Sequence, residues 1–146
     1  MNIPKEIIIH CSATKEGQNF DIKDVDRWHK DKGWKKCGYQ IVVKMNGQIQ
    51  FGRGFKEVGA HCTGHNSSSI GVCYIGGLDK NSKAADTRTA EQKQSLYVVV
   101  KMLCEAYGIT EKSIYCHNQL TSKACPCFTK EVFMKEYREW LKENAV

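Results

Sequence analysis

The chain has 146 residues, of which 41% are hydrophobic, and it carries a formal net charge of +6. No apolar stretch approaches the roughly 18–20 residues that span a bilayer, and the N-terminus "MNIPKEIIIH" lacks the regions of a signal peptide, so membrane insertion is not expected. We therefore expect synthesis in the reducing cytoplasm, where disulfides among the eight cysteines are disfavoured.

The positive charge favours polyanionic surroundings, which include nucleic acid, an anionic membrane face and a bacterial cell wall. The basic residues are spread along the chain and are densest in "RWHKDKGWKK". The sequence contains neither an arginine-rich tract nor a ribonucleoprotein-type aromatic motif. Charge alone does not choose the partner, and a nucleic acid is not favoured.

Strand and helix patterns alternate along the chain. Short runs rich in β-branched or aromatic residues predict strands, and helical patterns with plausible ends predict helices. In chain order these are a strand at 6–10, a helix at 21–32, strands at 39–45, 48–52 and 69–77, a helix at 89–107, a strand at 113–117 and a helix at 129–142. The dipeptide Asn46-Gly47 predicts a hairpin turn between the second and third strands.

The expected helix ends carry their own signals. The candidate N-caps are Asp21 or Asp24, Thr89 and Thr129, and the candidate stops are Gly33 and Gly108. Two prolines and the lack of a long Ser/Gly linker indicate one domain over residues 1–146. We predict an α/β fold with a central mixed β-sheet of about five strands flanked by about three helices.

Zinc is a candidate cofactor because His10 and His117 both stand at the carboxyl ends of predicted strands, and Cys125 follows closely. A single histidine at a strand end is more often structural, but two with a nearby cysteine favour a site. A zinc ribbon would need two ligand pairs, whereas only Cys125-Pro-Cys127 is present, and a disulfide between these two cysteines would close a very tight ring.

Four blocks of the sequence carry a resemblance to a known family. They are "IIIHCSAT", "WHKDKGWKKCGYQIVVKMNGQIQFGRGFKEVGAH", "NSSSIGVCYIGG" and "HNQLTSKACPCF". Together, and in this order, they resemble the zinc-dependent N-acetylmuramoyl-L-alanine amidases of the phage-lysozyme type, relatives of the peptidoglycan recognition proteins. The match runs from about Ile7 to Trp140, nearly the whole chain.

The resemblance implies one zinc ion per chain, with His10, His117 and Cys125 as ligands. It also implies catalytic roles for Tyr39 and Lys123. A metal held by two neutral imidazoles and one thiolate keeps a positive charge, so it can activate water and polarise a carbonyl. Lys123 can then stabilise the oxyanion, and Tyr39 can position water or relay a proton.

The chain departs from the family pattern at two positions. Gln40 stands where many relatives have a histidine, and we expect it to alter the surroundings of the site rather than the chemistry. Cys127 is an extra thiol next to the expected ligand Cys125, so the choice between these two cysteines stays open.

Substrate contacts are expected from Ser12, Trp34, His61 and Asn66, which offer an aromatic face and polar donors. Trp34 packing on the first helix, and the segment "HNSSS" serving only as a loop, are equally plausible alternatives. We interpret His29 and His65 as structural.

The implied reaction is hydrolysis of the amide bond between N-acetylmuramic acid and the L-alanine of the stem peptide. The implied partner is peptidoglycan, met by a monomer after release from the cytoplasm with the help of a separate permeabilising protein, as for a phage or prophage endolysin. One alternative is a non-catalytic peptidoglycan-binding module of the same fold, although such relatives typically lack the cysteine ligand. A remoter alternative, a regulator that binds nucleic acid or a polymerase, has no feature of its own in the sequence.

Overall fold

Five strands form one mixed sheet in the order β4-β3-β5-β1-β7 in the computed structural model, which describes residues 1–145. The pairs β3/β5, β5/β1 and β1/β7 are parallel, and the edge pair β3/β4 is antiparallel. The strands are β1 (Glu6–Cys11), β3 (Ile41–Val43), β4 (Ile49–Phe51), β5 (Ser69–Tyr74) and β7 (Ile114–Cys116). The predicted α/β class and mixed sheet are confirmed.

The two central strands are buried on both faces, as their nearly continuous apolar sequences predict. All six residues of β5 are buried. On β1, Ile7 and Ile9 belong to the main hydrophobic core, whereas His10 points to the opposite face because successive side chains alternate. The side chain of His10 therefore lies on the face of the sheet that is opposite the main hydrophobic core.

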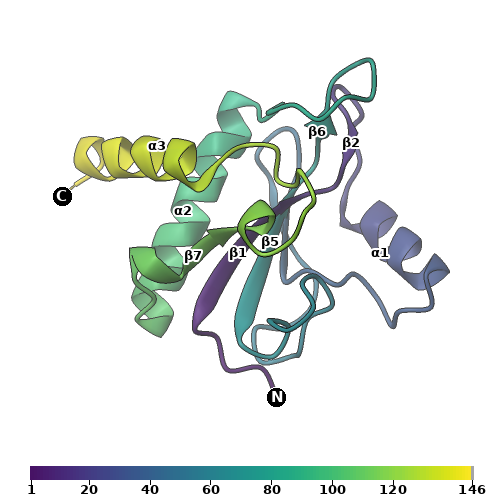
Figure 1. Ribbon diagram of the computed structural model, residues 1–146, viewed down its shortest axis with the longest axis horizontal. Coiled ribbons are helices and arrows are strands. Elements are labelled where there is room, and N and C mark those ends of the chain that lie inside the picture. The colour runs from purple at the N-terminus through teal and green to yellow at the C-terminus, as the bar shows by residue number, and fades with distance from the viewer. Residues whose placement is uncertain (146) are drawn as a thin grey trace.

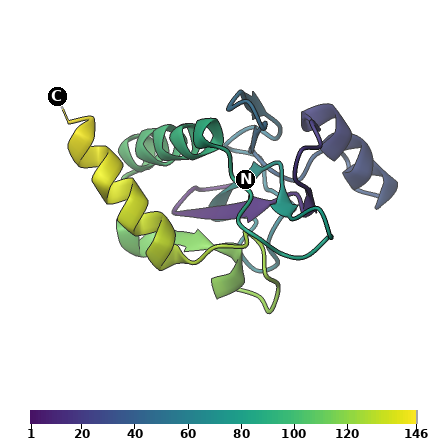
Figure 2. The same ribbon diagram turned by 90° about the horizontal axis from the view of Figure 1, so that it is seen from above.

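The three long helices divide between the faces of the sheet (Figures 1 and 2). Helices α2 (Ala90–Tyr107) and α3 (Lys130–Glu143) pack together, through residues such as Leu96 and Phe133, on the core that contains Ile7. Helix α1 (Ile22–Asp31) lies apart from them and packs through Val25 against Val42 and its neighbours. No helix within residues 1–145 has an apolar stretch long enough to cross a membrane.

The helix ends follow the predicted capping chemistry. Asp21 is the N-cap of α1, and Asp24 is not an alternative cap but completes the capping box from the third helical position. Thr89 and Thr129 cap α2 and α3, and Gly108 closes α2 with a φ of 66°. Gly33 also has positive φ, two residues beyond the last residue of α1.

The strand predicted over residues 69–77 ends earlier than expected, at Tyr74. After it the chain turns through Gly76 and Gly77, both with positive φ, and β6 (Gly77–Leu78) pairs with β2 (Thr14–Lys15) in a separate two-stranded sheet. A Cβ atom on Gly77 would lie 2.5 Å from the Cys11 sulfur, so the close approach requires glycine. The hairpin at Asn46-Gly47 is confirmed between β3 and β4.

Candidate active site

Neighbouring parallel strands bring the two expected histidine ligands together. Ile9 of β1 pairs with Cys116 of β7. The residues that follow them, His10 and His117, therefore lie side by side, with ring centroids 4.3 Å apart. His117 opens the short 3-10 helix η2 (His117–Gln119). Cys125 comes from the loop before α3, and one ligand atom from each of the three residues lies within 4.8 Å of the others.

The ring nitrogens of the two histidines are used differently. Nδ1 of His10 faces the sulfur of Cys125 at 3.9 Å, while its Nε2 lies 2.9 Å from Nδ1 of His61. Nδ1 of His117 is buried and has no hydrogen-bond partner within the described part of the chain. A buried polar atom without a partner is costly, so this nitrogen is suited to a ligand that supplies the missing contact.

Burial keeps both imidazoles in the neutral form. It is the main reason why the pKa of His10 lies well below the usual value, and the neighbouring His61, His117 and Lys123 lower that pKa further. Burial, followed by the charge of Lys123, also lowers the pKa of His117. Each ring therefore retains a lone pair at neutral pH, which is the form that binds metals.

The geometry separates the two cysteines of the Cys125-Pro-Cys127 turn. The Cys125 sulfur lies 3.2 Å from the backbone N–H of Cys11, which donates a hydrogen bond to it. The Cys127 sulfur instead lies 3.9 Å from the Cys11 sulfur and is not part of the three-residue cluster. Cys125 is thus the thiol that shares a centre with the two histidines.

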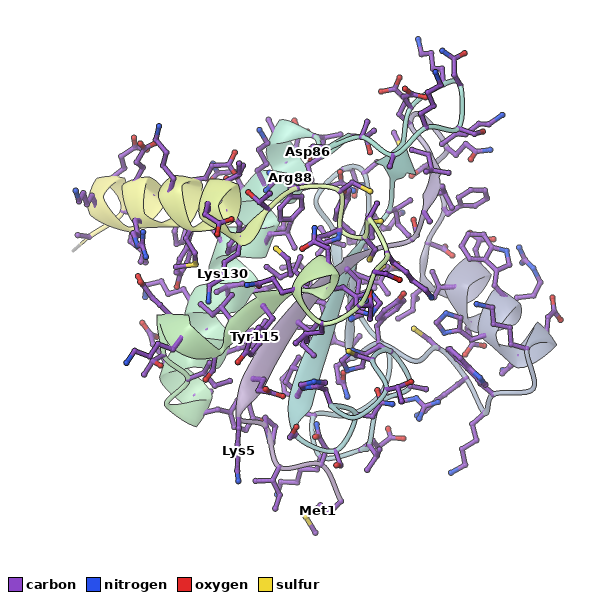
Figure 3. The ribbon with its side chains drawn as sticks, in the orientation of Figure 1. Met1, Lys5, Asp86, Arg88, Tyr115 and Lys130 are labelled. Carbon is purple, nitrogen blue, oxygen red and sulfur yellow. The ribbon has the colours of Figure 1, made fainter. Side chains whose placement is uncertain are left out.

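The loop that carries Cys125 is anchored from several sides. The Asn118 side chain donates to the carbonyl oxygen of Phe128 at 3.0 Å. The guanidinium of Arg88 lies 3.9 Å from the centre of the Phe128 ring and pairs with Asp86, and Figure 3 shows these two charged residues next to one another before α2. The loop that carries Cys125 is therefore held by contacts to η2 and to the segment before α2.

Two adjoining cavities open beside the cluster. The inner one has a volume of about 260 Å³ and includes His10, Tyr39 and Cys125 in its walls. The outer one has a volume of about 550 Å³ and includes Asn66. Both are lined by Trp34, Ala60, His61, His117 and Lys123. The candidate metal centre thus lies at the inner end of a groove that is large enough for part of a polymer chain.

Comparison with known proteins decides the family. A family profile described as N-acetylmuramoyl-L-alanine amidase matches residues 1–128. The chain belongs to the N-acetylmuramoyl-L-alanine amidase family. It is a peptidoglycan hydrolase of the type found among phage lysozymes and peptidoglycan recognition proteins, as the resemblance predicted.

Phage proteins are prominent among the similar sequences. The endolysin of Escherichia phage T7 is 36% identical over 141 residues, covering 96% of this amidase and 87% of the phage protein. The endolysin of Enterobacteria phage T3 is 37% identical over the same shares of the two chains. Among solved structures, the N-acetylmuramoyl-L-alanine amidase LysC from Clostridium intestinale URNW has a TM-score of 0.81 at 25% identity, covering 94% of this chain and 87% of that one.

The two expected catalytic side chains, Tyr39 and Lys123, both line the inner cavity of the amidase. The Tyr39 ring lies 5.0 Å from the His10 ring, and burial, followed by the nearby thiols, raises the pKa of its phenol well above the usual value. The phenol therefore keeps its proton at neutral pH. Lys123 is exposed at the rim of both cavities.

The four expected substrate residues all line the groove, but most of their polar atoms already have partners in the protein. The Ser12 hydroxyl lies 2.8 Å from that of Thr14 and accepts a hydrogen bond from the N–H of Gly76. The side-chain oxygen of Asn66 accepts hydrogen bonds from the backbone N–H groups of His61 and Cys62. Trp34 is 37% exposed, and its ring lies 4.5 Å from the His29 ring of α1 and 5.4 Å from the Lys32 ammonium.

The remaining residues singled out in the sequence support the walls of the site. His29 accepts a 2.7 Å hydrogen bond from the N–H of Gly38, and His65 pairs with Glu6, which agrees with structural roles. The Gln40 amide is buried and accepts from the N–H of Gly71. No sequence pattern marks Gly71 as part of the site, because its role depends on what packs over β5.

Proposed function

We propose that the amidase holds one zinc ion between His10, His117 and Cys125 and uses it to hydrolyse the amide bond between N-acetylmuramic acid and L-alanine. The supporting observation is the cluster of His10, His117 and Cys125, in which Nδ1 of His10 faces the Cys125 sulfur and the buried Nδ1 of His117 has no hydrogen-bond partner among the described residues. Two imidazoles and a thiol without a carboxylate form a donor set that suits zinc.

Bound zinc supplies this site with a Lewis acid and with a water whose pKa is lowered to about 7. The residues of the chain orient and complement that chemistry. Lys123 brings a positive charge to the rim of the centre, where a tetrahedral oxyanion needs stabilisation. Tyr39, whose proton is retained, can donate a hydrogen bond within the inner cavity or relay a proton to the departing nitrogen.

The groove provides the proposed peptidoglycan site. The partly exposed ring of Trp34, which lines both cavities, suits the apolar face of a sugar or a peptide segment. We expect Ser12 of the inner cavity and His61, which lines both cavities, to shape the wall next to the scissile bond, with Asn66 farther along in the outer cavity. The stem peptide would then extend along the outer cavity toward Asn66.

The test combines metal analysis with identification of the bond that is cut. Purified protein is expected to hold about one zinc per chain and to release new amino termini of L-alanine from purified sacculi. Removal of the metal with a chelator should abolish release, and added zinc should restore it. Zinc binding without release of amino termini would instead support a binding module.

The ligand assignment is tested by a matched pair of variants. Cys125→Ser should lose both zinc and activity because it removes the only thiol in the cluster. Cys127→Ser should keep both, since the Cys127 sulfur faces Cys11 instead. The reverse result, with loss only in Cys127→Ser, would refute the assignment.

We also propose that the amidase works as an endolysin does, on the cell wall and as a monomer. The phage relatives named above are endolysins, which supports action on the cell wall. Release from the cytoplasm then requires a separate permeabilising protein. Expression alone should leave cells intact, and coexpression with a membrane-permeabilising protein should lyse them; lysis by the amidase alone would contradict the requirement.

A further inference from the structure

His61 lies directly behind the proposed ligand His10 rather than beside the metal position. Its Nδ1 is 2.9 Å from Nε2 of His10, and the two rings meet edge to face with centroids 4.9 Å apart. Its other nitrogen, Nε2, lies 3.3 Å from the hydroxyl of Ser69. That hydroxyl donates a 2.7 Å hydrogen bond to the backbone carbonyl of His65. Four groups thus form a continuous chain leading away from the centre.

The carbonyl at the far end sets the direction of every hydrogen bond in this chain. A carbonyl oxygen can only accept, so the single hydrogen of the Ser69 hydroxyl is committed to it. The Ser69 oxygen must then accept from Nε2–H of His61. A neutral imidazole carries one hydrogen, so Nδ1 of His61 is an acceptor and Nε2 of His10 is the donor to it. The lone pair of His10 is left on Nδ1, which faces Cys125.

We propose that His61 is a positioning residue that fixes His10 in the tautomer and orientation needed to bind the metal through Nδ1. The inference rests on the proposed zinc site, and it gives His61 a role beyond the wall of the groove. Ligand histidines in metalloproteins commonly donate their second ring N–H to a carboxylate, a carbonyl or water, which fixes the ring and raises its basicity. Here a second imidazole, itself oriented by Ser69, occupies that place.

Two glycines make room for the His61 ring. A Cβ atom on Gly71 of β5 would lie 2.7 Å from ring atoms of His61, and one on Gly59 would lie 2.6 Å from Cδ2. Any larger residue at either position would displace the imidazole. The backbone of His61 is fixed as well, because its N–H donates to Asn66. The protein therefore holds this ring from both the strand side and the loop side.

The same contacts limit what His61 can offer to a substrate. Both of its ring nitrogens are engaged within the protein, one with His10 and one with Ser69. Burial lowers its pKa to about 3, so it carries no charge at neutral pH. Only the carbon edge and the face of the His61 ring are left to contact a substrate in the groove. A polar contact between His61 and peptidoglycan would have to break the chain that orients His10.

The first measurement needs no variant. Two-bond ¹H–¹⁵N correlation spectra of the metal-free protein at neutral pH report which nitrogen of each histidine carries the hydrogen. We expect Nε2–H at both His10 and His61. A metal-free protein in which His10 carries its hydrogen on Nδ1 would overturn the proposal. This result stands even if the wild-type protein binds no zinc, in which case only the zinc site would fail.

The second measurement is the zinc dissociation constant, determined by competition with a chromophoric chelator. His61→Leu should weaken zinc binding by about 10–100-fold, the usual effect of losing an outer partner of a ligand. His61→Asn should restore most of the affinity, because its side-chain oxygen can accept from Nε2–H of His10. The matched control His65→Leu removes an imidazole that pairs with Glu6 but keeps the carbonyl that Ser69 needs.

Circular dichroism of each variant checks that it folds. Wild-type zinc affinity in a folded His61→Leu protein would refute the positioning role. Equal losses in His61→Leu and His65→Leu would also refute it, because the effect would then not depend on the contact to His10. Zinc bound tightly by the wild type, weakly by His61→Leu and again tightly by His61→Asn would confirm it.

Discussion

The hydroxyl of Tyr74 donates a 2.7 Å hydrogen bond to the carbonyl oxygen of Pro126, and this contact joins the end of β5 to the loop that carries Cys125. Both groups are buried, and the Tyr74 side chain is fully enclosed. Pro126 follows the proposed thiol ligand directly. The position of Cys125 therefore depends on a strand that contributes no ligand of its own.

Replacing Tyr74 with phenylalanine should loosen this loop without changing the core. Tyr74→Phe leaves the buried Pro126 carbonyl without its donor, which should lower the free energy of unfolding by about 1–3 kcal/mol. Zinc affinity should fall with it, while secondary structure is retained. Urea unfolding with and without zinc measures both effects. The matched control Tyr137→Phe, on α3 where its ring faces Tyr97 of α2, should leave zinc affinity unchanged. Equal effects of the two variants would contradict the link.

Arg88 should contribute more to the free energy of unfolding than an arginine in an exposed ion pair. Its side chain is fully buried, pairs with Asp86 and Glu136, and stacks on Phe128. Arg88→Leu leaves Asp86 without this cation and Glu136 with the longer, 3.6 Å pair to Lys93, so we expect a loss of about 3 kcal/mol or more in the free energy of unfolding.

The matched control is Arg138→Leu, which removes an arginine from an exposed pair with Glu111. Exposed pairs of this kind are worth about 1 kcal/mol or less. Denaturant unfolding of both variants at the same pH and ionic strength makes the comparison. Losses of similar size would show that burial and the contact with Phe128 do not distinguish Arg88.

The strands and helix ends were predictable because their signals are local. The β-branched run of β1, the Asn46-Gly47 turn and the capping residue Thr89 each act within a few residues. The short pair of β2 and β6 was not predictable in this way. It forms because Gly77 can approach Cys11 closely, and that approach depends on the completed sheet.

The residues of the site also differ in whether a local sequence signal marks them. Strand-end positions and residue types indicate His10 and His117, and the family resemblance adds Cys125. The contact between His10 and His61 has no sequence signal, because it requires the segment after Gly59 to cross over Gly71. Supporting contacts come from residues far apart in the chain, and their roles become visible only once the strands are paired.

Lys123 should affect catalysis more than metal binding. It lines both cavities and lies near enough to His10 and His117 to lower their pKa values. Lys123→Met removes the cation at the site of the developing oxyanion, so kcat should fall by about 10²–10³-fold while zinc affinity is kept. Release of amino termini from sacculi gives the rate, and metal competition gives the affinity.

Two further variants show whether the charge is responsible. Lys123→Arg keeps a cation on the rim and should recover part of the lost rate. Lys112→Met removes an exposed lysine from the 3-10 helix η1 (Glu111–Ser113), which lines neither cavity, and should leave the rate unchanged. Full activity in Lys123→Met would exclude it from the reaction.

His29 should make the metal-free protein sensitive to acid. Its Nδ1 accepts a hydrogen bond from the N–H of Gly38 and can do so only when that nitrogen is unprotonated. Burial, followed by the charges of Lys32 and Arg53, lowers the pKa of His29 to about 4, whereas an unfolded histidine has a pKa near 6.5. Between these two values the unfolded chain binds more protons than the folded one. The stabilisation is therefore complete above about pH 6.5 and is lost as the pH falls toward 4.

The variant His29→Asn tests this pH dependence, because its side-chain oxygen can accept from Gly38 but does not titrate. Each proton taken up on unfolding changes the free energy of unfolding by at most about 1.4 kcal/mol per pH unit. We expect the wild-type value to fall more steeply than that of His29→Asn between pH 6.5 and 4. Urea titrations across this range measure both slopes, with Lys23→Asn as a control for placing asparagine on α1. Parallel slopes for wild type and His29→Asn would show that His29 takes up no proton on unfolding.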